Sequence, residues 1–531
     1  MKPIDTKEEN PFLTRSKKYA PFFLLILTAT FLRIYLLRFR LVPEGDSCHY
    51  LSFVKDFQRG DFSTIGTYWS LLWTGLITLF GSVLGDIELS GYLLSAFFGI
   101  MLIILAFIFA RRIFNKRVAY YTALLLTANL GLLNFSTRIF TESLYGFLLF
   151  GIAFLGWVSL ERQKNSYFFL LGLLIGLTYT VRPEALAFLF VFSILILIAR
   201  RKKAFLTLLI FCMATALFVL PVVIFYRVQF GTWTLGSKGT INFFIGENDT
   251  ELYRERNELT EDLSDNLYYK TLKDEIKQKG MLAYLAENRF FVKRFFINYK
   301  KFFLHWPHQF LTLPRGRRPL SVIFFALGSW ACLFVYKDRR KKYLYLLLFP
   351  FVIVTVLASC FVEERKIVPL IVFFVFIISC GADWLQTVLP NKPAKTLYQV
   401  ILAGLITISS IMAVRQASKD PPSNALLMKE IGLWMRDHFS QEERITLTEP
   451  YIQYYFYEKG PDRHLGLIYF EDYRTLARYM KSYSSKYLFI FSWLVPQHPA
   501  VTYLFNHEVD EFVLLKSFFR DDCEIRLYEL K

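Results

Sequence analysis

The hydrophobic residues of this chain occur in long blocks that polar residues hardly interrupt. A soluble globular chain breaks up its apolar residues at the period of a helix or a strand. Here several blocks approach the roughly 20 residues that a helix needs to cross the hydrocarbon of a bilayer. The clearest blocks are residues 20–37, 91–110, 185–199, 204–226 and 367–380. The pattern predicts an α-helical polytopic membrane protein and excludes a water-soluble globule.

The blocks and the loops between them predict about eleven transmembrane helices. Cationic loops alternate with loops that contain carboxylates, and the positive-inside rule places the cationic loops in the cytoplasm. The apolar segment 68–84 would break this alternation if it crossed, so we expect it on the outer side as an amphipathic or re-entrant segment. The cationic loops are 111–117, 162–164, 200–203, 337–342 and 392–395. The predicted spans are 20–38, 89–110, 118–134, 143–160, 166–181, 185–199, 204–226, 320–336, 343–361, 367–388 and 397–414.

Three larger segments fall outside the spans, all on the predicted outer face. They are a first outer loop (39–88), a long outer loop (227–319) and a carboxy-terminal domain (415–531). A cytoplasmic tail (1–19) precedes the transmembrane domain (20–414). The carboxy-terminal segment alternates helical patterns with short apolar runs, an order that predicts a small extracytoplasmic α/β domain. The helical patterns are 424–438 and 473–483, and the runs are 444–447, 487–491, 512–515 and 525–528.

Composition and charge agree with a membrane location. The chain is 54% hydrophobic and 18% aromatic, with a mean hydropathy of +0.35 and a formal net charge of +18. Much of the positive charge lies in the short cytoplasmic loops, so membrane topology explains it and no nucleic-acid partner is predicted. The six cysteines have no metal-type spacing. Two free thiols or a single bridge between Cys48 and Cys523 both remain open.

Ionisable residues at the rims of the outer loops are the candidates for chemistry, because charge is costly at membrane depth. The predicted spans are nearly free of charge, whereas carboxylates and arginines alternate at four outer positions. An arginine fork binds phosphate, and a carboxylate accepts a proton or a sugar hydroxyl. The pattern suits an enzyme that handles an anionic phosphate and a neutral hydroxyl. The residues are Glu44, Asp46 and His49, then Arg138 and Glu142, then Arg182 and Glu184, then Glu364 and Arg365.

Each position also has an ordinary structural explanation. Asp46 is typical of a solvated loop acid, and Glu142 suits a helix amino terminus, where the dipole favours an acid. The sequence Arg182-Pro183-Glu184 suits a tight turn with proline at the first helical position. Arg365 suits a side chain that snorkels to lipid headgroups. Only the occurrence of all four positions on one side favours a functional site.

These motifs resemble a known family, the family 39, PMT/ArnT-like glycosyltransferases of the GT-C superfamily. The resemblance covers about residues 20–389 and rests on the order, spacing and membrane side of the motifs. The motifs are Gly45-Asp46-Ser-Cys-His-Tyr50, Arg138 with Thr141-Glu142-Ser143-Leu144, Tyr179-Thr-Val-Arg182-Pro183-Glu184, and Glu364-Arg365-Lys-Ile-Val-Pro369. The resemblance implies a multi-pass enzyme of the inner or plasma membrane. Such an enzyme takes a sugar from a polyprenyl-phosphate carrier and passes it to a lipid, glycan or protein acceptor on the outer face.

The resemblance also implies roles for single residues. Asp46 is the expected base of an inverting displacement, and Glu44 is the second candidate, because Gly45 separates two acids that are adjacent in many members. Arg138, Arg182 and Arg365 are expected to bind the donor phosphate. The sequence departs from the family pattern at Tyr68-Trp69-Ser-Leu-Leu-Trp73 and at Arg365-Lys366, which leaves the acceptor undetermined. The remaining substrate-site or structural candidates are His49, Glu142, Glu184 and Glu364.

Further sequence features bear on metal binding and on association with the membrane surface. No structural zinc site is expected. His49 follows Asp46 by three residues, and His305 and His308 have a similar spacing, but Pro307 interrupts a helix at that pair and no Cys or third His lies near it. A divalent cation at the carrier phosphate is left open, since phosphates recruit such ions. Residues 288–305 alternate aromatic pairs with cations, which predicts an interfacial helix. Its cations Lys293, Arg294, Lys300 and Lys301 either anchor the helix at the headgroups or guide the carrier phosphate.

Three other functions remain as alternatives. A transporter or flippase of a lipid-linked sugar would share the ligand, but transporters usually show repeats and polar groups at mid-span, and neither is predicted here. A polymerase or ligase of another GT-C type would change only the product. A non-catalytic scaffold would depend on residues 415–531 and tolerate loss of Asp46.

The predicted topology is testable by cysteine labelling in intact cells. A cysteine introduced at Ser264 in the long outer loop should react with a membrane-impermeant maleimide. One introduced at Lys203 in a cationic loop should react only after the cells are lysed, because that loop is predicted to be cytoplasmic. The reverse pattern would invert the assigned topology.

Overall fold

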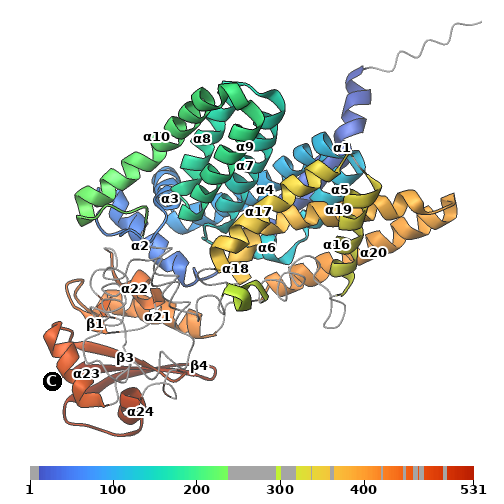
Figure 1. Cartoon of the computed structure of the whole chain (residues 1–531). Helices are drawn as coiled ribbons and strands as arrows, with labels where there is room; N and C mark the ends of the chain where they lie inside the picture. The colour runs from blue at the N-terminus through green and yellow to red at the C-terminus, as the bar shows by residue number, and fades with distance from the viewer. Residues whose placement is uncertain are drawn as a thin grey trace, which may run out of the picture.

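The computed structural model describes residues 11–236, 295–300, 319–336, 338–358, 364–419, 423–446, 450–458, 464–465, 472–493, 495 and 499–531. Helices form one bundle, and a small sheet flanked by helices lies against one end of it (Figure 1). We call this the sheet end of the bundle. The other end, which carries the cationic turn Arg201–Lys203, is called the far end.

The bundle is built from long helices joined by short turns. In chain order they are α1 (Pro11–Leu37), α2 (Asp46–Gln58), α3 (Leu71–Leu84), α4 (Ile87–Ile113), α5 (Lys116–Thr127), α6 (Leu130–Phe135), α7 (Glu142–Arg162), α8 (Asn165–Tyr179), η1 (Pro183–Leu186), α9 (Ala187–Arg200), η2 (Arg201–Lys203), α10 (Ala204–Phe230), α16 (Pro319–Trp330), η4 (Ala331–Val335), α17 (Arg340–Ala358), α18 (Glu364–Ile367), η5 (Val368–Leu370), α19 (Ile371–Val388) and α20 (Lys392–Ala417).

All eleven predicted spans coincide with helical segments, which confirms an α-helical polytopic membrane protein. Within the described residues, seven helical segments are long and apolar enough to cross a membrane, and three apolar helices are shorter. The number of crossings therefore stays a prediction, as does the position of α3 relative to the bilayer. Of the predicted interfacial helix 288–305, only residues 295–300 are described, and they are helical. Lys293, Arg294 and Lys301 lie outside the described residues.

The segment from Arg365 to Val388 forms the centre of the bundle. Nearly the whole of it is buried, whereas α1 and α20 are largely exposed along their apolar faces. A helix that is hydrophobic all round belongs inside a helical assembly, and α19 is such a helix. Its Phe373 stacks on Phe349 of α17 and packs against Phe150 of α7. The segment therefore links the two ends of the molecule through its core.

Small residues allow a close crossing of α8 and α10. In α8, Gly172 and Gly176 are four residues apart, and both face α10. A Cβ atom on Gly172 would lie 2.4 Å from the carbonyl oxygen of Phe211, and one on Gly176 would lie 2.6 Å from that of Thr215. Such small-xxx-small spacing lets two membrane helices approach backbone to backbone.

The sheet at the bundle end is mixed and has the strand order β2-β1-β3-β5-β4. β1 pairs in parallel with β2 and β3, while β5 pairs antiparallel with β3 and β4. Helices α21 and α22 pack on one face of the sheet, and α23 and α24 pack on the other. This arrangement confirms the predicted α/β fold. The elements are α21 (Ser423–His438), β1 (Ile445–Thr446), α22 (Pro450–Phe456), β2 (His464–Leu465), α23 (Tyr473–Ser482), β3 (Tyr487–Phe491), α24 (Pro499–Asn506), β4 (Phe512–Arg520) and β5 (Cys523–Leu530).

The close crossing of α8 and α10 predicts a stability effect. Gly172→Ala should destabilise the protein by about 1–3 kcal/mol, because the new methyl group meets backbone that moves only with the whole helix. Gly75→Ala is the matched control, since a Cβ atom on Gly75 of α3 meets nothing within 4 Å. Thermal unfolding in detergent should show a lower Tm only for Gly172→Ala. Equal Tm values for the two variants would contradict the packing.

Candidate active site

The first outer loop presents its two acids at the start of a short helix. Asp46 is the first residue of α2, and Gly45 before it has φ +37°. That conformation favours glycine, because a Cβ atom is disfavoured there. The turn is closed by bonds from the backbone NH groups of Ser47 and Cys48 to the carbonyl oxygens of Glu44 and Gly45. Glu44 and Asp46 therefore have fixed and different surroundings.

Each of the two acids contacts a different arginine. Arg138 Nη1 lies 2.9 Å from Glu44 Oε2. Arg365 Nη1 lies 2.5 Å from Asp46 Oδ2, and these two residues are 319 positions apart in sequence. All four side chains are about one third exposed, so a ligand from outside has access to them. The fold brings together residues from the first outer loop, from the segment before α7 and from α18.

The third predicted arginine has a buried partner. Arg182 Nη2 lies 2.6 Å from Glu142 Oε1, and the two side chains are only 6% and 3% exposed. The guanidinium also donates to the hydroxyl of Thr141 at 3.2 Å and lies over the ring of Tyr145 at 5.1 Å. Glu142 is thus the first residue of α7, as predicted, and also a salt-bridge partner. Because both side chains are almost completely buried, Arg182 lies beneath the exposed surface of the site.

Two further residues at the site were not among the sequence candidates. Tyr50 of α2 is buried, and burial raises the pKa of its hydroxyl, with Asp46 and Glu142 acting in the same direction. Tyr50 therefore stays protonated between the exposed and the buried carboxylates. Arg40 donates to Thr137 Oγ1 at 3.2 Å and to Asn134 Oδ1 at 3.4 Å, and it interacts electrostatically with Arg138 and Glu44. Tyr50 stands inside the quoted first-loop motif, but nothing in its spacing marked its function.

The remaining candidates differ in their surroundings. Glu184 interacts electrostatically with Arg182 and Tyr145, and its Oε2 is buried without a hydrogen-bond partner among the described residues. His49 packs its ring on Trp69 at a centroid distance of 5.0 Å, which places it in an aromatic cluster beside the acids. Glu364 is the first residue of α18, but its side chain lies outside those described. Lys366, next to Arg365, is buried.

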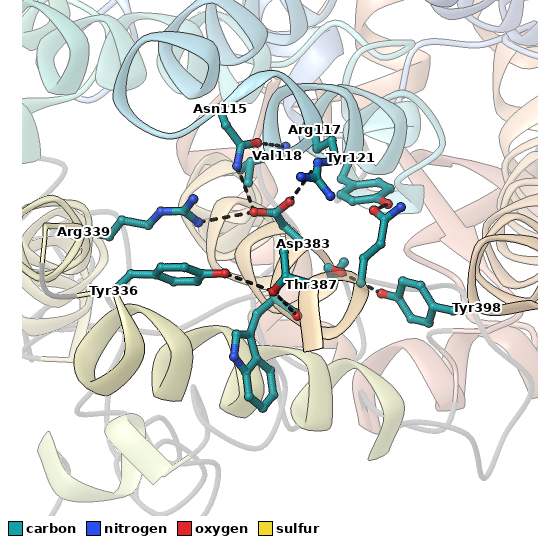
Figure 2. A network of polar contacts seen from close by, with 12 residues as sticks. Asn115, Arg117, Val118, Tyr121, Tyr336, Arg339, Asp383, Thr387 and Tyr398 are labelled. Atoms are coloured by element: carbon teal, nitrogen blue, oxygen red, sulfur yellow. Dashed lines mark hydrogen bonds and ion pairs between the residues drawn. The ribbon is translucent and has the colours of Figure 1, made fainter. Parts of the chain in front are cut away.

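Two charged residues inside the predicted spans were not among the sequence candidates. Asp383 lies in α19 at the far end of the bundle, where Figure 2 shows it surrounded by Asn115, Arg117 and Arg339. Asn115 Nδ2 donates to its Oδ2 at 2.9 Å, and Arg339 Nη1 lies 3.4 Å from the same atom. Arg33 in α1 is fully buried and donates to the carbonyl of Ala29. Both residues stand within apolar runs, where hydropathy averages conceal a single charge.

Within the described residues the structure contains neither a cluster of metal ligands nor a disulfide bond. No group of three or more His, Cys, Asp or Glu side chains lies close enough there to hold a metal ion. The described cysteines, which include Cys48 and Cys523, form no disulfide bond with one another.

Known proteins resemble the chain in sequence over one segment and in fold over most of its length. The family model described as dolichyl-phosphate-mannose-protein mannosyltransferase matches residues 71–226. No curated protein matches the chain in sequence. Apo ArnT from Cupriavidus metallidurans superposes with a TM-score of 0.61 at 12% identity, over 96% of this chain and 98% of ArnT. ArnT bound to undecaprenyl phosphate gives 0.55 at 11% identity over the same shares.

A second solved structure extends the likeness. The Archaeoglobus fulgidus oligosaccharyltransferase in complex with zinc and sulfate gives a TM-score of 0.58 at 14% identity, over 89% of this chain and 68% of that one. These similarities confirm the resemblance to PMT/ArnT-like proteins and the GT-C fold of the membrane part. At 11–14% identity these structures show a shared fold, and the likeness in sequence is to the mannosyltransferase family model over residues 71–226.

Burial of the Arg182–Glu142 pair predicts a large cost for breaking it. Arg182→Leu should destabilise the protein by about 3–5 kcal/mol, because it leaves a buried carboxylate without its counter-charge. Arg112→Leu is a matched control: Arg112 pairs with Glu161 at the same 2.6 Å, but the two side chains are 36% and 49% exposed. Its cost should stay below about 1 kcal/mol. Unfolding in detergent would contradict this account if both substitutions cost the same.

Proposed function

We propose that the protein is an inverting glycosyltransferase of the membrane. It takes a sugar from a polyprenyl-phosphate-linked donor and transfers it to an acceptor hydroxyl on the extracytoplasmic face. The observation that carries the proposal is the exposed ion pair of Asp46 and Arg365, which joins a candidate base to a candidate phosphate ligand. The fold adds support, because the similar protein ArnT binds undecaprenyl phosphate in one of its structures.

Arg365 has two competing anionic partners in this proposal. In the structure its guanidinium contacts the carboxylate of Asp46 at 2.5 Å. A donor phosphate offers the same planar fork two oxygens, and arginine binds phosphate bidentately. When the phosphate replaces the Asp46 carboxylate as the partner of the guanidinium, that carboxylate becomes available to the acceptor hydroxyl. Donor binding thereby prepares the base at the place where the reaction occurs.

The transfer then needs one base and no acid. Asp46 accepts the proton of the acceptor hydroxyl, and the acceptor oxygen forms a bond to the anomeric carbon. The bond from that carbon to the phosphate oxygen breaks, and its electron pair leaves with the polyprenyl phosphate. Because attack comes from the face opposite the leaving group, the configuration inverts. Phosphate leaves as an anion that Arg365 stabilises, whereas a glycosidase needs a second carboxyl group to protonate its leaving oxygen.

The other charged residues divide into two groups by exposure. Arg138 and Arg40 lie beside Glu44, so they supply further positive charge for the donor, with Glu44 as the second candidate base. Arg182 and Glu142 neutralise each other under the site, so we assign them a positioning role through Tyr50. Arg182 is therefore proposed as an indirect rather than a direct contributor to phosphate binding.

The sides of the membrane follow from charge. The acids and arginines of the site lie at the sheet end, and the loops richest in lysine and arginine lie at the far end. By the positive-inside rule the far end faces the cytoplasm, which puts the site and residues 415–531 outside. The alternative, a transporter of the same lipid, would bind the donor without breaking the sugar–phosphate bond.

Transfer of labelled sugar tests this proposal. Membranes that contain wild-type protein and a polyprenyl-phosphate-linked radiolabelled sugar should yield labelled acceptor. Asp46→Asn should lower the rate about 10²–10⁴-fold, because a lost general base costs that much, and Glu44→Gln should cost less. The protein should keep its Tm, since Asp46 is one third exposed.

Asp61→Asn is the control within the same loop. Asp61 is exposed and hydrogen-bonds only locally, to Ser63, so its loss should leave transfer unchanged. A large loss in Glu44→Gln with none in Asp46→Asn would assign the base to Glu44. Movement of intact donor across the membrane without any labelled acceptor would replace the transferase by a transporter.

A further inference from the structure

The helix that begins with Asp46 ends against the carboxy-terminal domain. Lys55 Nζ, in the last turn of α2, donates to the carbonyl oxygens of Tyr454 at 2.6 Å and Tyr457 at 3.0 Å. Arg59, at the carboxy-terminal cap of α2, donates to the carbonyl oxygen of Glu458 at 2.6 Å. These carbonyls belong to the last turn and the end of α22, where a helix leaves its C=O groups without intrahelical partners. Two cations of α2 thus cap the carboxy-terminal end of α22, the position where the helix dipole favours positive charge.

Neighbouring contacts reinforce the same junction. The hydroxyl of Tyr454 donates to Glu88 Oε1 at 3.0 Å, which ties α22 to the start of α4. The ammonium group of Lys55 also lies over the ring of Tyr454, 4.2 Å from its centroid. Val42, in the first outer loop, is buried in the hydrophobic core that α21 and α22 form on the sheet. The loop that carries the two acids is therefore attached to the domain before and after the site.

The geometry of α2 connects this attachment to the reacting carboxylate. Asp46 and Lys55 stand at opposite ends of one 13-residue helix. Nine positions at 1.5 Å per residue separate them by about 14 Å. A helix of this length moves as a rigid unit, so a displacement at Lys55 is transmitted to Asp46. The turn before α2, with its positive-φ Gly45, holds the other end of the helix.

We propose that the carboxy-terminal domain positions the candidate base, and that Lys55 is the positioning residue through which it does so. The inference rests on the proposed function, because it assigns to the domain the orientation of Asp46 against Arg365. It gives residues 415–531 a role in the transfer reaction without any contact to the substrate.

The charge state of Lys55 supplies an independent readout. Burial lowers the pKa of Lys55 to about 8, with Arg59 and Arg436 acting in the same direction and Glu88 and Cys48 opposing it. Tyr454 also faces the ammonium group. Lys55 is therefore charged below about pH 8 and loses its charge as the pH rises through that value. Since hydrogen bonds from charged donors are the stronger ones, the cap should weaken above pH 8 in the wild type and hold in Lys55→Arg.

The test combines turnover with the accessibility of a native thiol. Cys48 is fully buried on α2, two residues after Asp46, so its labelling by a maleimide, mapped by mass spectrometry, reports a displaced α2 without any reference to activity. Lys55→Met should raise the Cys48 labelling rate and lower kcat, each by about tenfold or more, which corresponds to the loss of hydrogen bonds to a charged group. KM for the donor should change little, because Arg138 and Arg365 remain. Lys55→Arg should restore both values.

Lys486→Met is the matched control. Lys486 belongs to the same domain and pairs with Glu529 at 2.7 Å, and its described contacts lie within that domain, so neither readout should change. If Lys55→Met does not fold, wild type and Lys55→Arg are compared at pH 7 and pH 9. From pH 7 to pH 9 the labelling rate should rise more in the wild type than in Lys55→Arg, beyond the increase in thiolate that both proteins share, and turnover should fall more in the wild type.

The outcomes separate the two proposals. Wild-type transfer with unchanged kcat and unchanged Cys48 labelling in Lys55→Met would overturn the positioning role and leave the transferase intact. Identical pH responses of wild type and Lys55→Arg would also overturn it. Absence of transfer in the wild type, together with faster labelling in Lys55→Met, would support the attachment of α2 and overturn the proposed reaction.

Discussion

The cost of an unpaired charge in hydrocarbon is the constraint on which this structure depends. An ionisable side chain at membrane depth is stabilised only by a counter-charge, by backbone carbonyls or by water. The central segment from Arg365 to Val388 follows this rule at both of its ends. Arg365 meets Asp46 at the sheet end, and Asp383 meets Arg117 and Arg339 at the far end. Between them the segment is apolar and almost completely buried.

The two ends differ in one property that decides their function. At the far end, Asp383 is 1% exposed and its partners close around it (Figure 2), so the cluster holds α5, α17 and α19 together. At the sheet end, Asp46 and Arg365 are about one third exposed, so an incoming anion or hydroxyl can compete for them. The same interaction is therefore structural where it is sealed and available for chemistry where it is open.

Sequence patterns predicted the helices well because membrane helices are selected by length and hydropathy. After residue 420, α21, α23, β1, β3, β4 and β5 also followed from period and run length, whereas the short elements α22, β2 and α24 did not. The pairing of Asp46 with Arg365 and of Glu44 with Arg138 was beyond reach, since each joins segments far apart in the chain. Asp383 and Arg33 were missed because one charge hardly changes the mean hydropathy of a long window. The contacts of Lys55 with α22 could not be foreseen either, as backbone carbonyls leave no mark in a sequence.

Phosphate binding to Arg365 is the central claim, and a structure of the protein in nanodiscs with a polyprenyl phosphate would test it most directly. The account predicts phosphate oxygens within hydrogen-bond distance of the Arg365 guanidinium and an Asp46 carboxylate that has separated from it. A phosphate bound elsewhere, with Asp46 and Arg365 still in contact, would contradict the account.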